Sequence, residues 1–397
     1  MPVVLASLAI AVTAIVLSHR ISRALTQESV VVNAADAAAY SGAAWTARRL
    51  NLIAYTNRAL VANHIAVGHL TATISWLRYV DEGATKIANY SRYLPYVGQA
   101  TSAAERTVAL ALLASERSAA VMIRGFDLLH RLMAISQLDA RADLRPGRVD
   151  AVMTRVAKAY DETLAVNDSD AIEAIPTPYR SAMTGLLAGQ RISAYRKLQR
   201  SRTGRDQGYF ARLIAASIDH DPSLRRWLDG SRTMRNRGYG SGRRGWERSL
   251  ISLVRFRKQG HTHQPDLPDA GGWRSADRFQ VSFFNLGKLE WGGWSTAAEG
   301  AADADALGGG YRGVRHYTRL RAADDNARLM QIPALVTGPI PGTTTDGAIS
   351  AHLGMAEVRY HIPAKCGADC PRAGAPASLF NPYWEATLAA PSLPGLP

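Results

Sequence analysis

The chain has 397 residues, of which 47% are hydrophobic, and a formal net charge of +14 at pH 7. This length exceeds what one typical domain needs and this apolar fraction is ample for buried cores, so composition excludes a single small domain and favours two or three structural units. The charge is concentrated: residues 191–258 hold 18 Lys or Arg against 5 Asp or Glu, a surplus of 13 of the 14 charges.

An uncharged apolar stretch from Val3 to Leu17 opens the chain. Counted from Pro2 to Ser18 it has 17 residues, the lower limit for a helix that crosses a bilayer. A cleavable secretory signal would place basic residues before the apolar core and a small-x-small site after it, whereas here Met1-Pro2 precedes the core and Ser22-Arg23-Ala24 follows it. We therefore expect residues 1–20 to form an uncleaved transmembrane anchor, with a signal peptide or a buried helix as alternatives.

The charges that flank this segment bear on its orientation. His19, Arg20 and Arg23 follow it, and no basic side chain precedes it. By the positive-inside rule this arrangement favours a cytoplasmic body for the protein.

Residues 21–199 are predicted to be a helical domain. The part from Ser22 to Tyr90 lacks proline and is rich in alanine, which predicts a long helix or a helix pair. At 100° per residue one side gathers an apolar face of Ile53, Ala54, Leu60, Val61, Ile65 and Ala72. Asn57, His64 and Thr71 fall within this face at a spacing of seven. We expect them to be hydrogen-bonded core or interface groups that fix the helix register, with a functional histidine as the alternative.

A second helical block is predicted from about Thr101 to Leu138. Its apolar surface comprises Val108, Leu112, Val121, Ile123, Phe126, Leu129, Leu132 and Met133. The stretch 93–98 separates it from the first block and Arg145-Pro-Gly147 ends it, so the two blocks should pack as an antiparallel hairpin. Shorter helices are expected at about 148–166 and 178–199.

Residues 200–246 mix arginine with glycine and polar residues and are predicted to be a connection between domains. Their basic surface includes Arg235, Arg237, Arg243 and Arg244, with aromatic residues interleaved. The favoured interpretation is a solvated connection. Binding of anionic lipid or nucleic acid is the alternative, although no RNP, zinc-finger or helix-turn-helix signature accompanies the arginines.

From residue 247 to residue 397 the pattern indicates strands, at 249–256, 279–284 and 356–362. Glycine-rich turns at 292–293 and 308–310 separate these runs. The predicted fold class is therefore α+β: an N-terminal membrane-anchor helix continues into a long helical hairpin region, and an antiparallel β-rich C-terminal unit follows.

Residues with catalytic or metal-binding chemistry are sparse. His261 and His263 with Asp266 and Asp269 would offer zinc ligands, but solvent-exposed side chains are the favoured interpretation. Asp303 and Asp305 would offer oxygen ligands to calcium, yet the twelve-residue loop pattern is missing. The chain has no G-x-S-x-G, H-E-x-x-H or Walker sequence, and we expect neither enzymatic activity nor a cofactor.

The two cysteines, Cys366 and Cys370, stand four residues apart. They would close a small disulfide loop in an oxidising compartment or remain thiols in a reducing one. A metal site with the nearby His361 is a third alternative.

Several segments together resemble the TadE/TadG-like proteins of Flp (tight adherence) pilus assembly. They are the apolar opening helix with 33–43 (NAADAAAYSGA), 45–51 (WTARRLN), 54–63 (AYTNRALVAN), 356–360 (AEVRY) and 378–386 (SLFNPYWEA). In the first of these the alanines would let neighbouring membrane helices approach closely. The chain departs from the pilin pattern, because its apolar helix contains no glutamate and no basic leader precedes it.

The resemblance implies a bacterial inner-membrane protein with a single span and most of its chain in the periplasm. Such a protein would act in pilus assembly or secretion, as a minor-pilin-like subunit or an assembly factor, with other pilus-assembly membrane proteins or pilin subunits as partners. Its placement would suit a disulfide between Cys366 and Cys370, and it is opposite to the orientation that the flanking charges favour.

Overall fold

The computed structural model describes residues 2–94, 96–173, 180–181, 183–185, 187, 193–201, 238–239, 244–250, 253–263, 272–311, 313–314, 316–321, 329–339, 349–362 and 377–390. The chain divides into two compact units. Unit 1 comprises Met1–Asn57, Ser136–Arg200 and Thr318–Pro397, and unit 2 comprises Arg58–Ile135 and Ser201–Tyr317. Each unit is built from separated parts of the chain, so the division differs from the consecutive segments expected from the sequence.

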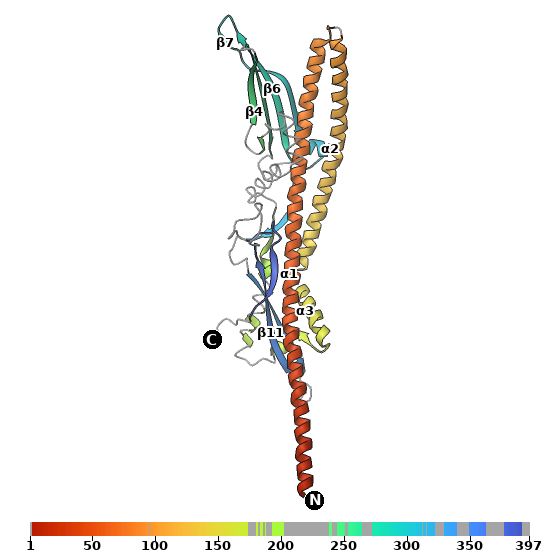
Figure 1. The fold of residues 1–397 in the computed structure, drawn as a ribbon, viewed down its shortest axis with the longest axis vertical. Helices are drawn as coiled ribbons and strands as arrows, with labels where there is room; N and C mark the ends of the chain where they lie inside the picture. The colour runs from red at the N-terminus through yellow and green to blue at the C-terminus, as the bar shows by residue number, and fades with distance from the viewer. Residues whose placement is uncertain are drawn as a thin grey trace. The chain divides into compact units, whose positions relative to one another are not determined.

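Three helices account for most of the first 160 residues: α1 (Pro2–Ser91), α2 (Val97–Ala142) and α3 (Pro146–Tyr160) (Figure 1). The long helix expected after the apolar opening is therefore one continuous helix of 90 residues. The break predicted at 93–98 is confirmed, and Pro146 begins α3, where its missing N–H costs no hydrogen bond. The α+β fold class is confirmed, since antiparallel sheets follow the helices.

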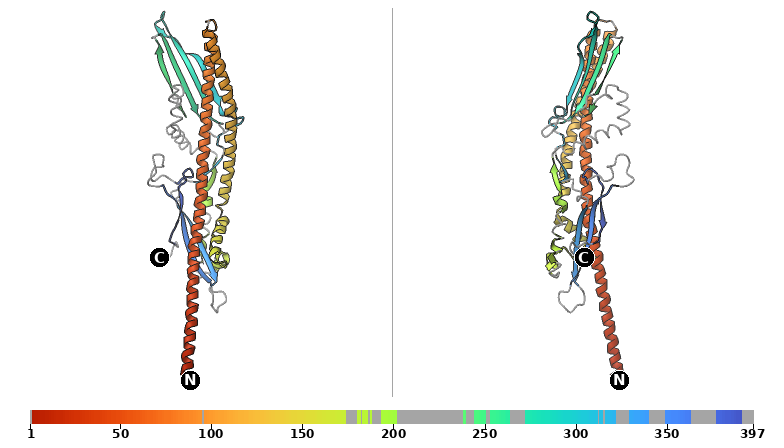
Figure 2. Two further views of the ribbon diagram at one scale, coloured as in Figure 1. Left: turned by 45° about the vertical axis from the view of Figure 1, so that its right-hand side comes forward. Right: turned by 90° about the vertical axis from the view of Figure 1, so that its left-hand side faces the viewer.

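In unit 2, α1 and α2 form the antiparallel hairpin that the sequence predicts. Near the turn the Ser91 and Thr101 hydroxyls lie 2.6 Å apart, and further along Arg78 forms a 2.7 Å ion pair with Glu116. Ile74 and Ala119 are buried in one shared cluster. The two helices of this unit lie side by side in Figure 1 and in the left view of Figure 2.

The sheet of unit 2 consists of β3 (Gly238–Tyr239), β4 (Arg244–Leu250), β5 (Val254–His263), β6 (Arg274–Asn285), β7 (Glu290–Trp291) and β8 (Ser295–Asp303). β5 pairs with β6 antiparallel from Val254↔Phe283 to His263↔Arg274, and β4 and β8 extend this pair on its two sides. A short helix, α10 (Ala304–Gly308), follows β8 and ends at Gly309, whose φ of +65° suits a residue without a Cβ atom.

The core of unit 2 lies between its sheet and its helices. Trp273 and Tyr311 are almost fully buried against Val67 and Ile123. The strand β8 approaches α1 closely at Gly300, where a Cβ atom would lie 2.2 Å from the Ser75 carbonyl oxygen. Glycine is therefore required at this contact between strand and helix.

The main sheet of unit 1 has the order β1–β10–β11–β12, all antiparallel. Its strands are β1 (Ala165–Val166), β10 (Leu329–Pro339), β11 (Ile349–Tyr360) and β12 (Trp384–Leu388). A separate pair joins β2 (Leu198–Ser201) and β9 (Tyr317–Leu320), and short helices α4 (Ser169–Glu173) and α6 (Ser193–Arg196) complete the described elements.

The alanine-rich stretch at residues 33–43 forms part of the core of unit 1. Ala34, Ala35, Ala38, Ala39 and Ala43 are fully buried. A Cβ atom at Gly354 of β11 would lie 2.3 Å from the Ala35 carbonyl oxygen, and one at Gly42 would lie 2.9 Å from the Met153 side chain. These small residues therefore permit close packing, but in this structure the elements that approach are the chain's own β11 and α3, whereas we had expected other membrane helices.

The run predicted as one strand at residues 249–256 belongs to two strands, because β4 ends at Leu250 and β5 begins at Val254. The antiparallel pairing of Leu250 with Val254 shows that the chain reverses direction between them. The apolar run continues through this reversal without glycine or proline, so the pattern contains no turn signal. Two further segments also differ from expectation: Ala165–Val166 is a strand, and Leu198 begins another.

Candidate functional site

A buried ion pair links two strands of unit 2. The Lys258 ammonium on β5 is 2.7 Å from Oδ1 of Asp277 on β6, and both side chains are fully buried. The Ser75 hydroxyl of α1 donates a 2.7 Å hydrogen bond to the other oxygen, Asp277 Oδ2. Gly260 stands directly opposite Asp277, and a Cβ atom there would lie 2.6 Å from Oδ1. The ion pair and the Ser75 hydroxyl therefore join β5 and β6 to α1. The absence of a side chain at Gly260 leaves the space that the Asp277 carboxylate occupies.

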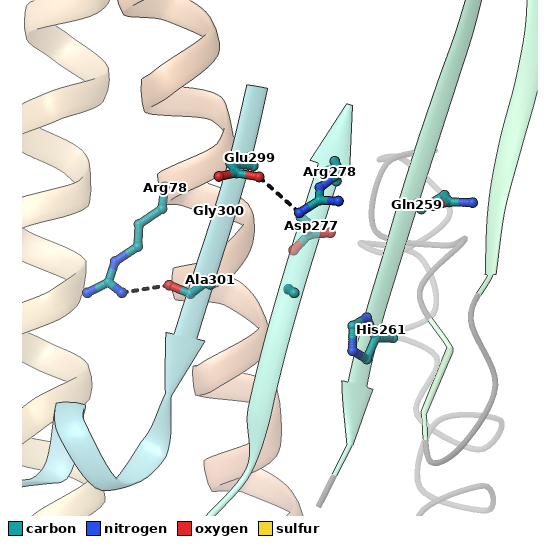
Figure 3. Close-up of a pocket in the computed structure, with 9 residues that line it drawn as sticks. Arg78, Gln259, His261, Asp277, Arg278, Glu299, Gly300 and Ala301 are labelled. Atoms are coloured by element: carbon teal, nitrogen blue, oxygen red, sulfur yellow. Dashed lines mark hydrogen bonds and ion pairs between the residues drawn. The ribbon is translucent and has the colours of Figure 1, made fainter. Parts of the chain in front are cut away.

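A cavity of about 470 Å³ adjoins this ion pair. Its lining comprises Arg78, Gln259, His261, Ala276, Asp277, Arg278, Glu299, Gly300 and Ala301 (Figure 3). Across the strands Arg278 and Glu299 form a 3.2 Å ion pair, and Arg78 donates to the Ala301 carbonyl over 2.6 Å. Ion pairs thus balance the charges of the lining. The cavity is therefore polar, but its electrostatic potential is not strongly positive or negative.

Asn57, which the sequence predicts to be a hydrogen-bonded group that fixes the helix register, lies at the centre of a hydrogen-bond network in unit 1. Its amide nitrogen donates to the carbonyls of Thr318 and Leu379, both over 2.8 Å. Its oxygen accepts from Gln137 Nε2 at 2.7 Å, and Gln137 Oε1 accepts from the Thr318 N–H at 2.8 Å. Asn57 therefore ties α1 to α2 and to two distant chain segments, while its own polar atoms are satisfied inside the core.

His64 and Thr71 are also buried, in unit 2. His64 Nδ1 lies 2.8 Å from the Tyr311 hydroxyl, and the Trp273 ring nitrogen donates to the His64 carbonyl over 2.7 Å. Thr71 donates to the Val67 carbonyl one turn back in α1. Burial raises the pKa of Tyr311. Both residues predicted here on the helix face thus lie in the protein core.

His130 of α2 belongs to the same aromatic cluster, with its ring centroid 6.0 Å from that of Tyr311. Burial lowers the pKa of His130 to about 4, and the nearby Asp127 carboxylate opposes this shift only in part. The ring is therefore neutral at physiological pH, which suits a core position.

The remaining candidate residues are dispersed. The rings of His261 and His263 stack on β5 with centroids 5.0 Å apart, while Asp266 and Asp269 lie outside the described residues. Asp303 accepts hydrogen bonds from the Asp305 N–H and from Arg274. In the described ranges no three His, Cys, Asp or Glu side chains are grouped to hold a metal ion.

Two further candidates from the sequence are the cysteine pair and the basic surface. Cys366, Cys370, Arg235, Arg237 and Arg243 lie outside the described residues. Arg244 is the first residue of β4 and pairs with Gly260. The stretch from Gly240 to Gly245 matches the spacing G-x-G-x-x-G, but it leads into a strand, whereas a dinucleotide site requires a helix there.

The opening of α1 has the length and apolar character of one membrane span or signal anchor. Its large side chains, from Val3 to Leu25, are exposed, whereas Val31 and the alanines after it are buried. The same helix thus changes from an uncovered apolar surface to a protein core. This arrangement is what a helix needs if it leaves a bilayer and enters a folded unit.

Lys258, Asp277, Ser75 and Gln137 were not recognised from the sequence. Asp277 and Lys258 are separated by 19 positions, and only the strand register of β5 and β6 brings them together. A lysine at an inward position of an alternating strand is the one signal that was available. Searches against protein-family models, curated proteins and solved structures find no match to this chain.

Proposed function

We propose that this protein is a membrane-anchored, non-enzymatic component of Flp/Tad-type pilus assembly or secretion, either a minor-pilin-like subunit or an assembly factor. In this proposal a single span holds it in the bacterial inner membrane, and most of the chain is periplasmic. The observation that carries the proposal is the continuity of α1 from an exposed apolar segment into the core of unit 1.

A continuous helix of this kind is suited to an anchor that holds the folded part of the protein at a defined position relative to the membrane. Residues 31–54 of α1 pack into unit 1, so the apolar segment before them is joined to folded protein without an intervening loop. A flexible linker would let the folded part move freely, whereas a continuous helix limits its distance and tilt relative to the membrane. This property is useful to a protein that must align partners at a membrane surface.

Three of the segments that carry the resemblance to TadE/TadG-like proteins meet in unit 1: 45–51, 356–360 and 378–386. Asn51 exchanges two hydrogen bonds with Trp384. The rings of Tyr360 and Trp384 lie edge to face at 5.3 Å, and Asn381 donates to the Tyr360 hydroxyl over 3.2 Å. These three motifs therefore contribute to one structural core, which supports a shared role for them.

Deletion of the gene in its native bacterium is the first test. We expect loss of surface filaments in electron micrographs, and restoration by the full chain. A complementing chain in which Leu8, Ala11 and Ile15 are replaced by Asp should fail to restore filaments, because charged residues oppose insertion into a bilayer. Replacement of the exposed Tyr90 by Asp serves as the matched control and should restore them.

Topology provides an independent test. An enzyme that is active only in the periplasm is fused after Pro397, and alkylation of Cys366 and Cys370 is measured before and after reduction. Enzyme activity together with protected cysteines is the expected result. Normal filaments in the deletion strain would refute the proposal, and an inactive fusion with reactive thiols would favour the alternative in which the Arg-rich segment binds anionic lipid or nucleic acid in the cytoplasm.

A further inference from the structure

The helix α2 presents two faces in unit 2. One face packs inward, with Ala119, Ile123 and His130 buried. The other face leaves large apolar side chains exposed, with exposed fractions from 42% at Leu129 to 70% at Val121. They are Leu110, Leu113, Val121, Met122, Leu128, Leu129, Leu132 and Ile135. The second face is therefore more apolar than a solvated helix surface usually is.

Four of these residues, together with Gly125, follow a heptad pattern. Val121, Gly125, Leu128, Leu132 and Ile135 are separated alternately by four and three positions. All five positions are exposed. This spacing places them in one row along the helix, as in the seam of a coiled coil.

The same row continues toward the start of α2 through smaller residues. They are Ala104, Thr107, Ala111, Ala114 and Ser118, and all of them are exposed. From Ala104 to Ile135 the row extends over roughly 46 Å at the rise of an α-helix. We call these ten positions the α2 stripe. A partner helix could therefore contact the stripe along several heptads.

The two edges of the α2 stripe differ in charge. Arg117, Arg124 and Arg131 lie along one edge at a spacing of seven, and all three are exposed. Arg131 also forms a 2.6 Å ion pair with Asp127, which leaves its side chain 60% exposed. The opposite edge carries Met122 and Leu129 and no charge in this region. The stripe is therefore an apolar surface with one basic border.

This border decides between possible occupants. If a second copy bound antiparallel, the two arginine rows would face one another and repel. If it bound parallel, each arginine row would face the uncharged edge of the other copy, and no ion pair would form between them. A helix with acidic side chains beside its apolar row would instead cover the apolar side chains of the stripe and form ion pairs with its arginine row.

We propose that the α2 stripe is the docking surface for an amphipathic helix of another protein, whose apolar heptad row is bordered by Asp or Glu. This inference goes beyond the proposed role in pilus assembly and does not rest on it. The partner helix covers Leu128, Leu132 and Ile135, and its acidic residues pair with the arginine row.

The test uses the full chain in detergent micelles and two fluorescent peptides of four heptads. Both peptides have Ile and Leu in the apolar row, and the flanking positions are Glu in one peptide and Lys in the other. By fluorescence anisotropy we expect the Glu peptide to bind about tenfold or more tightly than the Lys peptide. Replacement of Arg117, Arg124 and Arg131 by Glu should reverse this preference.

Variants of the apolar row complete the test. Leu128→Gln combined with Leu132→Gln should weaken binding of the Glu peptide about tenfold or more, because apolar anchors dominate such interfaces. Both side chains are more than half exposed, so the fold should persist, as circular dichroism would verify. Ile87→Gln on α1, an equally exposed aliphatic residue, is the matched control and should bind normally.

Three results would overturn the proposal. The first is equal binding, or no binding, of the two peptides. The second is unchanged preference after reversal of the arginine row. The third is a dimer of the full chain in sedimentation experiments that the Leu128 and Leu132 changes dissociate, since that result would identify a second copy as the occupant.

Discussion

Asn51 of α1 and Trp384 of β12 are joined by two hydrogen bonds, and each residue is donor in one and acceptor in the other. Asn51 Nδ2 lies 2.8 Å from the Trp384 carbonyl oxygen, and the Trp384 N–H donates to Asn51 Oδ1 over 3.0 Å. A side-chain amide thus takes the place of a neighbouring strand at the edge of β12. This contact fixes the last described strand of the chain onto its first helix.

Replacement of Asn51 by Asp should therefore destabilise unit 1. The carboxylate cannot donate to the Trp384 carbonyl and would face it with like partial charge, so we expect a loss of about 1–3 kcal/mol. Thermal unfolding of the full chain in detergent, followed by tryptophan fluorescence, measures the change. Asn33→Asp, at an exposed position on the same helix, should leave the transition unchanged.

The buried pair of Lys258 and Asp277 allows a double-mutant cycle. Lys258→Met or Asp277→Leu alone should cost about 3–5 kcal/mol, because each leaves the other charge buried without its partner. The double variant should recover most of that loss. Chemical denaturation of unit 2 provides the free energies. If the two single losses simply add, the ion pair has no special role.

The exposed pair of Arg278 and Glu299 is the control for this cycle. Both side chains are more than half exposed, at 56% and 55%. Arg278→Gln should therefore change stability by less than about 1 kcal/mol.

The stability of unit 2 should fall as the pH is lowered below neutrality. His130 has a pKa of about 4 in the folded chain, below its ordinary value of 6.5, so folding favours the neutral ring. The contribution of the neutral ring to the free energy of unfolding is complete above pH 6.5. It is lost between pH 6.5 and pH 4, where the free energy of unfolding falls by up to about 1.4 kcal/mol per pH unit.

The variant His130→Phe tests the source of this dependence. It keeps an aromatic ring in the cluster with Tyr311 and cannot take up a proton. Its midpoint of unfolding should vary less between pH 6.5 and pH 4 than that of the natural chain. An identical pH dependence in both proteins would assign the effect to other groups.

Gly354 should not tolerate a larger side chain. A Cβ atom there would lie 2.3 Å from the backbone oxygen of Ala35, and a backbone atom of a long helix cannot move aside without shifting the helix. We expect Gly354→Ala to destabilise unit 1 by about 3 kcal/mol or more. Limited proteolysis should then cleave unit 1 sooner. At Gly293 no atom lies within 4 Å of the added carbon, so Gly293→Ala is the matched control.

Some parts of this structure could be predicted from the sequence because local signals determine them. The apolar face of α1 is an example: Ile53, Ala54, Leu60, Val61, Ile65 and Ala72 were placed on one side, and all six are buried. Because an α-helix has 3.6 residues per turn, the positions of the apolar residues in the sequence are enough to identify the buried side of this helix. The break near Pro95 and the end of α2 before Pro146 are similarly local.

Other parts depend on contacts between distant segments. Ala165 and Val166 form a strand because they pair with Thr337 and Val336, and nothing in the two residues themselves signals this. Likewise, Leu132 and Met133 were assigned to one apolar surface of α2, although Leu132 is exposed and Met133 is partly buried. A helix with apolar residues on most sides does not reveal which side its own sheet will cover.

The discontinuous composition of the two units has a consequence for synthesis on the ribosome. Every residue of unit 2 has been made once Tyr317 is added, whereas unit 1 needs the strand from Trp384 to Leu388 to pair with β11. The alanine face of α1 is translated first, yet its partner strands are translated last. During this interval the nascent chain carries an unpaired β11 edge and an uncovered helix face, both of which promote aggregation. Folding of unit 1 is thus completed only after β12 has been translated, and a chaperone that shields these surfaces until then would increase the yield.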